Sequence, residues 1–137
     1  MKCAIDKGKI VREGTFVELT AFNKKGQPVG HADAGLYNTD KKFVWLHEIH
    51  VRDECRRKGV ATEMIGALAE FGKMKGAQLL YAYPAPPQSD PSVPQKSLDK
   101  FYRKNGFKPC NAPKDAVTIT DEGLFKRGVC LPLKAKQ

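Results

Sequence analysis

The sequence predicts an α/β protein built on one mixed sheet, with antiparallel strands first, then a strand–helix–strand crossover, then a second helix and closing strands. Two observations carry this prediction. The first fifty residues hold short runs of β-branched and aromatic residues separated by polar turns, as strands do. A helical pattern then begins at Gly59, because Ala61, Met64, Ile65 and Leu68 fall at the i, i+3, i+4, i+7 spacing of one helix face.

The expected strands precede that helix. Residues 15–22 and 29–37 are the two arms of a predicted hairpin around an N-K-K-G-Q-P turn. Residues 43–51 (F-V-W-L-H-E-I-H-V) are expected to form a more buried strand, and residues 9–12 add a short edge strand.

The helix over residues 59–75 is expected to end at Gly76, because glycine adopts the left-handed conformation that closes helices. Residues 77–83 (A-Q-L-L-Y-A-Y) follow as a strand, and the order strand–helix–strand implies a parallel pair. The proline-rich segment 84–95 must then be a loop, since proline lacks a main-chain donor and interrupts regular structure.

A short helix is expected over 97–104, with Ser97 as its N-cap and Asn105-Gly106 as its stop. Phe107 and the ranges 117–120 and 125–133 are expected to supply the closing strands. The length is typical of one domain and no internal repeat occurs, so residues 1–137 are predicted to form a single domain.

Composition restricts the class of protein. The chain has 137 residues, 24 Lys and Arg against 15 Asp and Glu, and a net charge of +9, which favours anionic ligands. Nucleic acid is a possible partner but is not required to explain the charge. No apolar run approaches the roughly 20 residues that a membrane span needs, and the first residues do not resemble a signal peptide. We therefore expect a basic cytoplasmic protein with no membrane partner; the sequence does not indicate its oligomeric state.

The four cysteines are Cys3, Cys55, Cys110 and Cys130. They form no C-x-x-C pair and no zinc-ribbon spacing, so they do not predict a metal centre. With no export signal, we expect reduced thiols with a structural role.

The segment H-V-R-D-E-C-R-R-K-G-V-A-T carries the clearest chemical signal. It places a basic turn with Gly59 between a buried strand and the start of a helix. Main-chain N–H groups converge at a helix N-terminus, the helix dipole adds positive charge, and a glycine lets a ligand approach the main chain. Arg56, Arg57 and Lys58 add formal charge. Neither G-x-x-x-x-G-K-[ST] nor G-x-G-x-x-G is present, so the pattern predicts an anion site of another kind.

Arg56-x-x-Gly59-x-Ala61 resembles the (Q/R)-x-x-G-x-(G/A) signature with which the GNAT superfamily of N-acetyltransferases binds acetyl-coenzyme A. Downstream, F-Y-R-K-N-G-F (residues 101–107) resembles the second landmark of that family, a helix with a tyrosine followed four residues later by Gly-Phe. The two occur in the family's order with a strand between them. The resemblance covers about residues 43–108 and implies the GNAT fold.

The resemblance also assigns expected roles. The turn would bind the coenzyme's pyrophosphate through main-chain amides, with Thr62 as a further donor. The strand end would pair with the pantetheine arm, and Tyr102 would be the general acid that protonates the departing thiolate. The residues expected to bind the coenzyme are Ile49, His50, Val51, Arg56, Arg57, Lys58, Gly59, Val60, Ala61 and Thr62.

The general base has two candidates, His47 and Glu48. Alternation along a strand places Trp45, His47 and Ile49 on one face and Glu48 on the other. The pKa of a histidine suits proton transfer near neutral pH, whereas Glu48 could act through an ordered water. His47 and His50 would diverge on a strand, so their H-x-x-H spacing does not predict a metal site.

Two departures from the family fall on the acceptor side. The fifty residues before the signature strand are mostly strand-like, so the pair of N-terminal helices that usually walls the acceptor site is expected to be reduced or absent. The family's asparagine ahead of the tyrosine is replaced by Gln95. An open groove favours a protein lysine or N-terminus over a small amine as acceptor.

Two functions therefore stay open. The first is N-acetyltransfer from acetyl-coenzyme A to a primary amine by direct attack, without a metal. The second is a non-catalytic binding module that uses its basic surface on nucleic acid or a protein. A second basic cluster consists of Lys96, Lys100, Arg103, Lys104 and Lys108.

Overall fold

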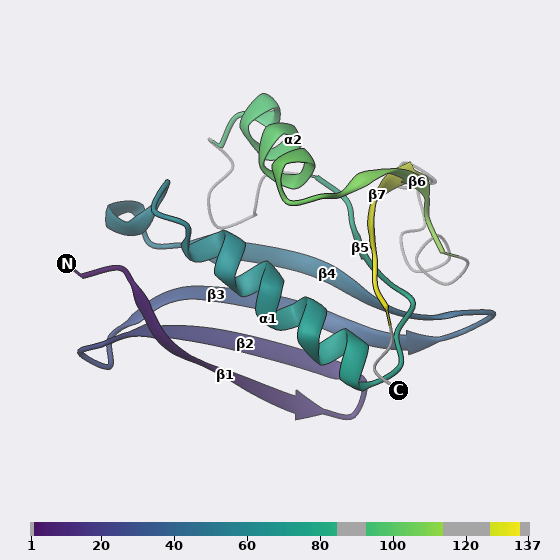
Figure 1. Ribbon diagram of the computed structural model, residues 1–137, viewed down its shortest axis with the longest axis horizontal. Coiled ribbons are helices and arrows are strands. Elements are labelled where there is room, and N and C mark those ends of the chain that lie inside the picture. The colour runs from purple at the N-terminus through teal and green to yellow at the C-terminus, as the bar shows by residue number, and fades with distance from the viewer. Residues whose placement is uncertain (1, 85–92, 114–126, 135–137) are drawn as a thin grey trace.

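The computed structural model describes residues 2–84, 93–113 and 127–134 (Figure 1). Within them, four strands precede the first α-helix, and the elements are, in chain order, β1 (Ile5–Glu13), β2 (Phe16–Asn23), β3 (Pro28–Asn38), β4 (Lys42–Val51), the 3-10 helix η1 (Asp53–Cys55), α1 (Val60–Met74), β5 (Leu79–Ala82), α2 (Gln95–Lys104), β6 (Lys108–Asn111) and β7 (Arg127–Pro132). The mixed α/β architecture is confirmed.

The strands form one sheet in the order β1-β2-β3-β4-β5-β7-β6. Neighbouring strands are antiparallel except β4 and β5, which are parallel and connected through α1. This confirms the predicted crossover. No helix precedes β4 in the described residues, so the expected loss of the N-terminal helices is confirmed as well.

The helix α1 lies across one face of the sheet (Figure 1). Met64, Ile65 and Leu68 are buried against this inner face, which confirms the predicted apolar stripe. The sheet contributes Val17, Leu19, Val44 and Leu46 to the same core. A second, smaller cluster on the other face consists of Phe43, Trp45, Tyr81 and Cys130.

Pairing between β4 and β5 is short. It runs from Phe43 opposite Leu79 to Leu46 opposite Ala82, and the part of β4 beyond residue 46 has no partner strand on that side in the described residues. The two strands thus part near the middle of the molecule. A free main-chain edge of β4 is the result.

Several boundaries differ from the prediction. The strand β1 spans nine residues instead of four, because its alternately placed polar side chains lie on an exposed edge where composition is a weak signal. The helix α2 begins at Gln95 with Pro94 as N-cap and no side-chain cap, so the prediction for Ser97 is wrong. The ranges predicted as strands at 117–120 and at the start of 125–133 lie outside the described residues.

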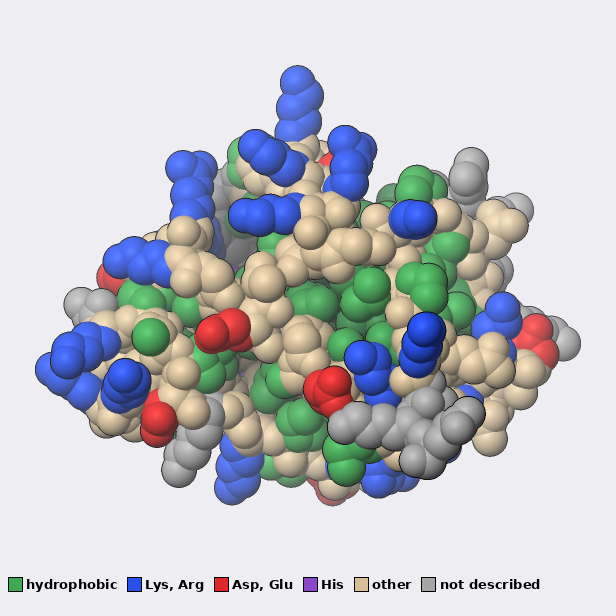
Figure 2. Space-filling model, in the orientation of Figure 1, with side chains coloured by type: hydrophobic (Ala, Val, Ile, Leu, Met, Phe, Trp, Pro, Cys, Tyr) green, Lys and Arg blue, Asp and Glu red, His purple; other side chains and the backbone are tan. Residues whose placement is uncertain are grey.

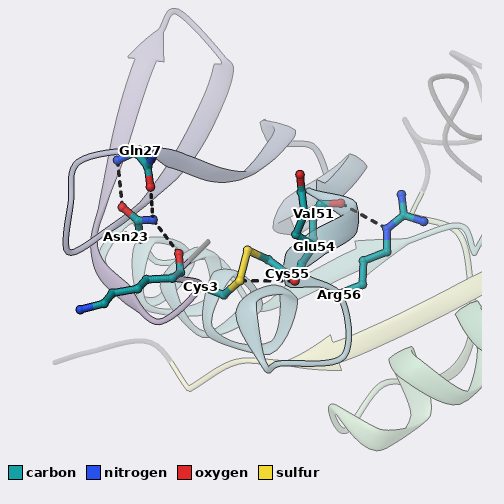
Figure 3. The surroundings of a disulfide bond; sticks show 8 residues. Cys3, Asn23, Gln27, Val51, Glu54, Cys55 and Arg56 are labelled. Atoms are coloured by element: carbon teal, nitrogen blue, oxygen red, sulfur yellow. Dashed lines mark hydrogen bonds between the residues drawn. A yellow bond between two sulfur atoms is a disulfide. The ribbon is translucent and has the colours of Figure 1, made fainter.

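The prediction of reduced thiols is also wrong for this structure. Cys3 is bonded to Cys55, and Cys110 to Cys130, with sequence separations of 52 and 20 residues. Spacing along the chain does not indicate either pair, since both join segments that only the sheet brings together. Figure 3 shows the first disulfide, which attaches the N-terminal segment to η1 directly before Arg56.

No helix in the described part of the chain has the length and apolar character needed to cross a bilayer.

Candidate functional site

The basic turn between β4 and α1 has the backbone of an anion-binding loop. Gly59 is the N-cap of α1 in the left-handed conformation, with φ of 84°. Arg57 is the one non-glycine residue with positive φ among those described, at 63°. A left-handed arginine is unfavourable by about 1 kcal/mol and persists only where surrounding structure holds it. Two left-handed residues within three positions bend the chain sharply before the helix.

Space above the turn is open. A Cβ built on Gly59 would have no atom within 4 Å. The main-chain N–H groups at the start of α1 have no partners within the helix, whereas Glu63 N already donates to Gly59 O at 3.0 Å. The turn therefore leaves main-chain donors accessible from solvent, and the predicted anion site stays a prediction.

The three basic side chains of the turn have different surroundings. The Arg56 guanidinium turns back to the strand: Nε donates to Val51 O at 3.2 Å, and Nη2 lies 3.1 Å from Asp53 Oδ1 and 3.4 Å from His50 Nε2. Arg56 therefore braces the turn. Arg57 and Lys58 are exposed and leave their charges toward solvent.

The other predicted coenzyme residues lie beside the turn. Ile49, His50 and Val51 form the end of β4, which has no partner strand on the β5 side in the described residues, although Val51 O accepts from Arg56. The Val60 side chain is buried in the core, so only its main chain is available. Ala61 and Thr62 are on the first turn of α1.

A β-bulge at His47 changes which residues share a face. Asp33 pairs with Glu48, but Ala34 pairs with Leu46, so His47 is the extra residue of β4. Trp45 belongs to the outer cluster, whereas Ile49 packs on the inner core. The predicted alternation, with Trp45, His47 and Ile49 on one face and Glu48 on the other, is therefore wrong. Both base candidates are on the outer face.

The His47 side chain lies among aromatic rings on that face. The ring centroids of His47 and Trp45 are 4.8 Å apart, and His47 Nε2 is 3.3 Å from the Tyr37 hydroxyl oxygen. Burial lowers the pKa of His47 below its ordinary value of 6.5, and the Asp33 carboxylate partly offsets this by raising it. The imidazole is therefore neutral at pH 7. Sequence reasoning missed Tyr37, whose distance along the chain gives no signal.

Carboxylates line the outer face next to His47. Glu18, Asp33 and Glu48 are directly opposite one another on β2, β3 and β4. His31 Nε2 lies 2.9 Å from Asp33 Oδ1, and Glu18, His31 and Asp33 place their ligand-type atoms within 4.8 Å of one another. Like charges on neighbouring strands repel one another. A cation beside these carboxylates would relieve that repulsion, so the row attracts cations.

The two histidines of the H-x-x-H spacing do not act together. His47 contacts Tyr37, whereas His50 contacts Arg56.

Tyr102 is buried, with 6% of its surface exposed. Its ring packs edge-on against Phe101 and Phe107, at centroid distances of 5.2 and 5.1 Å. Burial raises the pKa of the Tyr102 hydroxyl well above its ordinary value, so it keeps its proton at neutral pH. A protonated hydroxyl is what a general acid requires.

The profile of the Acetyltransferase (GNAT) family matches residues 5–107. The chain belongs to this family. The matched range contains both sequence landmarks, the free edge of β4 and the bulge at His47. No curated protein matches the sequence at a significant level.

Solved structures of other GNAT proteins share the fold. Nourseothricin acetyltransferase has a TM-score of 0.61 and 17% identity, covering 90% of this chain and 67% of its own. A GNAT acetyltransferase from Staphylococcus aureus has a TM-score of 0.63 and 17% identity, with coverages of 88% and 69%. The PaiA N-acetyltransferase of Thermoplasma acidophilum, in complex with coenzyme A, has a TM-score of 0.59 and 16% identity, with coverages of 85% and 59%.

Proposed function

We propose that this GNAT protein, as one domain over residues 1–137, transfers an acetyl group from acetyl-coenzyme A to a primary amine by direct attack. The observation that carries the proposal is the left-handed Gly59 turn, open to solvent at the start of α1 and adjacent to the unpaired edge of β4. This combination offers one anion site and one strand edge to the same elongated ligand. Acetyl-coenzyme A has both parts, a pyrophosphate and an amide-bearing arm.

The residues around the turn fit that ligand. Main-chain N–H groups from Arg57 to Thr62 would bind the pyrophosphate, with Arg57 and Lys58 supplying charge. The Arg56 N–H, also expected from the sequence to bind it, already donates to Asp53 O at 3.3 Å. The edge of Ile49–Val51 would pair with the pantetheine arm. Its main-chain N–H groups also provide donors for the negative charge that develops on the thioester oxygen.

The reaction needs two proton transfers, which give the base candidates and Tyr102 their proposed roles. An alkyl ammonium with an ordinary pKa near 10.4 must lose a proton before attack, and His47 or Glu48 takes it. The amine nitrogen then bonds to the thioester carbon and the C–S bond breaks. Tyr102 gives its proton to the thiolate, and the second amine proton replaces it. The net products are the amide, coenzyme A and one proton.

The outer face supports a cationic acceptor. The carboxylates Glu18, Asp33 and Glu48 extend from the bulge across β3 to β2 and favour the approach of an ammonium group. No described helix precedes β4 to wall this face, and the three carboxylates there are exposed or half-buried. We propose a protein lysine or N-terminus as acceptor, in preference to a small amine.

Ligand-dependent stabilisation tests the coenzyme assignment. Acetyl-coenzyme A at 100 times its dissociation constant is expected to stabilise the fold by about 2.7 kcal/mol, measured as a rise in Tm. Coenzyme release with lysine peptides, free N-terminal peptides, polyamines and aminoglycosides then identifies the acceptor. Preference for small amines would contradict the acceptor proposal, and no Tm change at millimolar ligand would contradict the coenzyme site.

The Tyr102→Phe variant tests the general acid. It removes only the hydroxyl and keeps the ring against Phe101 and Phe107, so we expect kcat to fall about 10²-fold with little change in coenzyme affinity. Steady-state kinetics and calorimetric titration measure the two quantities. An unchanged kcat would show that Tyr102 only packs against its neighbours and is not the general acid.

One observation favours the alternative of a non-catalytic binding module. Figure 2 shows Lys and Arg side chains gathered at the top of the view, where α2 lies. The exposed cations on this surface are Lys96, Lys100, Arg103, Lys104 and Lys108. Nucleic-acid binding that weakens steeply with salt, together with no acetyl transfer to any acceptor, would support this function. A cytoplasmic location stays a prediction, without support from the paired cysteines.

A further inference from the structure

We infer that Tyr37 is a positioning residue that holds the His47 imidazole in one tautomer, so that His47 and not Glu48 takes the proton from the acceptor amine. The inference rests on the proposed acetyltransfer function. Three separate features of the sheet converge on this pair of side chains: a bulge, a glycine and a hydrogen bond.

The bulge aims His47 at Tyr37. Without the extra residue, alternation from Trp45 would still leave His47 on the outer face, but Glu48 would face the core. With it, Glu48 pairs with Asp33 and His47 bends out of the ladder toward β3. The His47 ring then meets Tyr37 edge-on at a centroid distance of 6.3 Å.

Gly35 provides the space for Tyr37. A Cβ on Gly35 would lie 2.6 Å from Tyr37 Cε2 and 2.8 Å from its hydroxyl oxygen, so the ring lies directly over this glycine. The ring also stacks on Phe43 at 5.3 Å and packs against Trp45 at 5.8 Å. The tyrosine thus leans back along β3 toward the bulge, with its hydroxyl fixed by packing on several sides.

The hydrogen bond fixes which ring nitrogen faces Tyr37, and it is compatible with either group as the donor. Tyr37 Oη lies 3.3 Å from His47 Nε2. If Nε2–H donates to the tyrosine oxygen, Nδ1 carries the free lone pair and can accept the amine's proton. The imidazolium that forms keeps the same hydrogen bond, strengthened by its charge. With Nε2–H as the donor, the tyrosine oxygen orients the ring, holds this tautomer and favours the protonated product.

The charges around His47 have distinct effects. Desolvation of the imidazole lowers the pKa of His47, and Asp33 on β3 partly offsets this by raising it. Glu48 follows on β4 opposite Asp33, and the Tyr37 hydroxyl contacts the imidazole directly. We assign Asp33 and Glu48 to attraction of the ammonium group, with proton acceptance at His47 Nδ1.

Nitrogen NMR of the three histidines tests the tautomer without any activity. The His47 signals are assigned from the spectrum of His47→Gln. In the wild type at pH 8 we expect the Nε2–H tautomer to dominate, and in Tyr37→Phe we expect a mixture and a pKa lower by roughly half a unit. Gly35→Ala retains the hydroxyl but displaces the ring, so it should give the same result. A dominant Nδ1–H tautomer, or a tautomer unchanged in both variants, would overturn the inference.

Two control variants separate the hydrogen bond from packing and charge. Trp45→Phe keeps an aromatic edge beside His47 and should leave the tautomer unchanged. Asp33→Asn should lower the pKa of His47 but also leave the tautomer unchanged, because only a charge is lost. If the tautomer shifts in either control, then aromatic packing or the charge of Asp33 sets the wild-type preference. That result would contradict the role of Tyr37.

The pH dependence of kcat follows from the direction in which the pKa of His47 is shifted. Activity requires neutral His47, so the acid limb of kcat lies below pH 6.5 in the wild type and moves lower in Tyr37→Phe, while the plateau falls about 10-fold. KM for acetyl-coenzyme A should not change. Full activity in His47→Gln would assign the base to Glu48 and overturn the inference. Absence of transfer to any acceptor in the wild type would instead contradict the proposed function, and the NMR result would still stand.

Discussion

Gly59→Glu is expected to abolish binding of acetyl-coenzyme A. The glutamate side chain would fill the open space above the turn, and its carboxylate would repel the pyrophosphate. The left-handed backbone at φ of 84° adds a cost of about 1 kcal/mol to folding for any residue with a Cβ. Calorimetric titration should show no heat of binding at ligand concentrations that saturate the wild type.

Two variants separate these causes. Gly59→Ala carries the same backbone cost without the charge or bulk, so we expect a smaller loss of affinity, about 10-fold. Gly66→Glu places the same side chain on the exposed side of α1, where a Cβ also has open space, and should bind the coenzyme normally. Retained binding in a folded Gly59→Glu protein would contradict the coenzyme assignment.

Loss of the Cys3–Cys55 disulfide is expected to destabilise the fold by about 4 kcal/mol. The bond closes a separation of 52 residues, and constraint of the unfolded chain grows with that length. Cys55 is fully buried and lies next to Arg56, whose guanidinium ties the proposed coenzyme-binding turn to the end of β4 (Figure 3). Urea unfolding of Cys3→Ser measures the loss, and the same variant should also bind acetyl-coenzyme A more weakly.

Cys110→Ser is the matched control. Its disulfide closes only 20 residues and joins β6 to β7, away from the turn, so we expect a loss of about 3 kcal/mol with coenzyme affinity unchanged. Equal effects on affinity in the two variants would contradict a link between Cys55 and the turn. Uptake of four alkyl groups by the unreduced protein in mass spectrometry would contradict both disulfides.

Local patterns predicted most of the fold. The apolar stripe of α1 and the glycines at its two ends are properties of neighbouring residues, and the helix occupies 60–74 close to the predicted 59–75. The β2–β3 hairpin and the long strand β4 were likewise readable from alternation and turn residues. The basic turn with Gly59 before α1 was recognisable for the same reason, since its spacing is contained within six residues.

Features that depend on contacts between distant segments could not be predicted from the sequence. The bulge at His47 is a mismatch between two strands, so alternation along β4 alone assigned Ile49 to the wrong face. The Tyr37 contact with His47 needs the pairing of β3 with β4 and the missing side chain of Gly35. Both disulfides join residues that only the sheet and the turn bring together.

By itself, then, the sequence determined the α/β class, the crossover helix and the glycine turn that precedes it, because each depends on contiguous residues whose main-chain preferences are local. Tertiary structure alone decided which side chains share the outer face with His47, how Arg56 is tied to the end of β4, and which cysteines are bonded. The physical reason is that strand register and side-chain packing are set jointly by segments far apart in the chain.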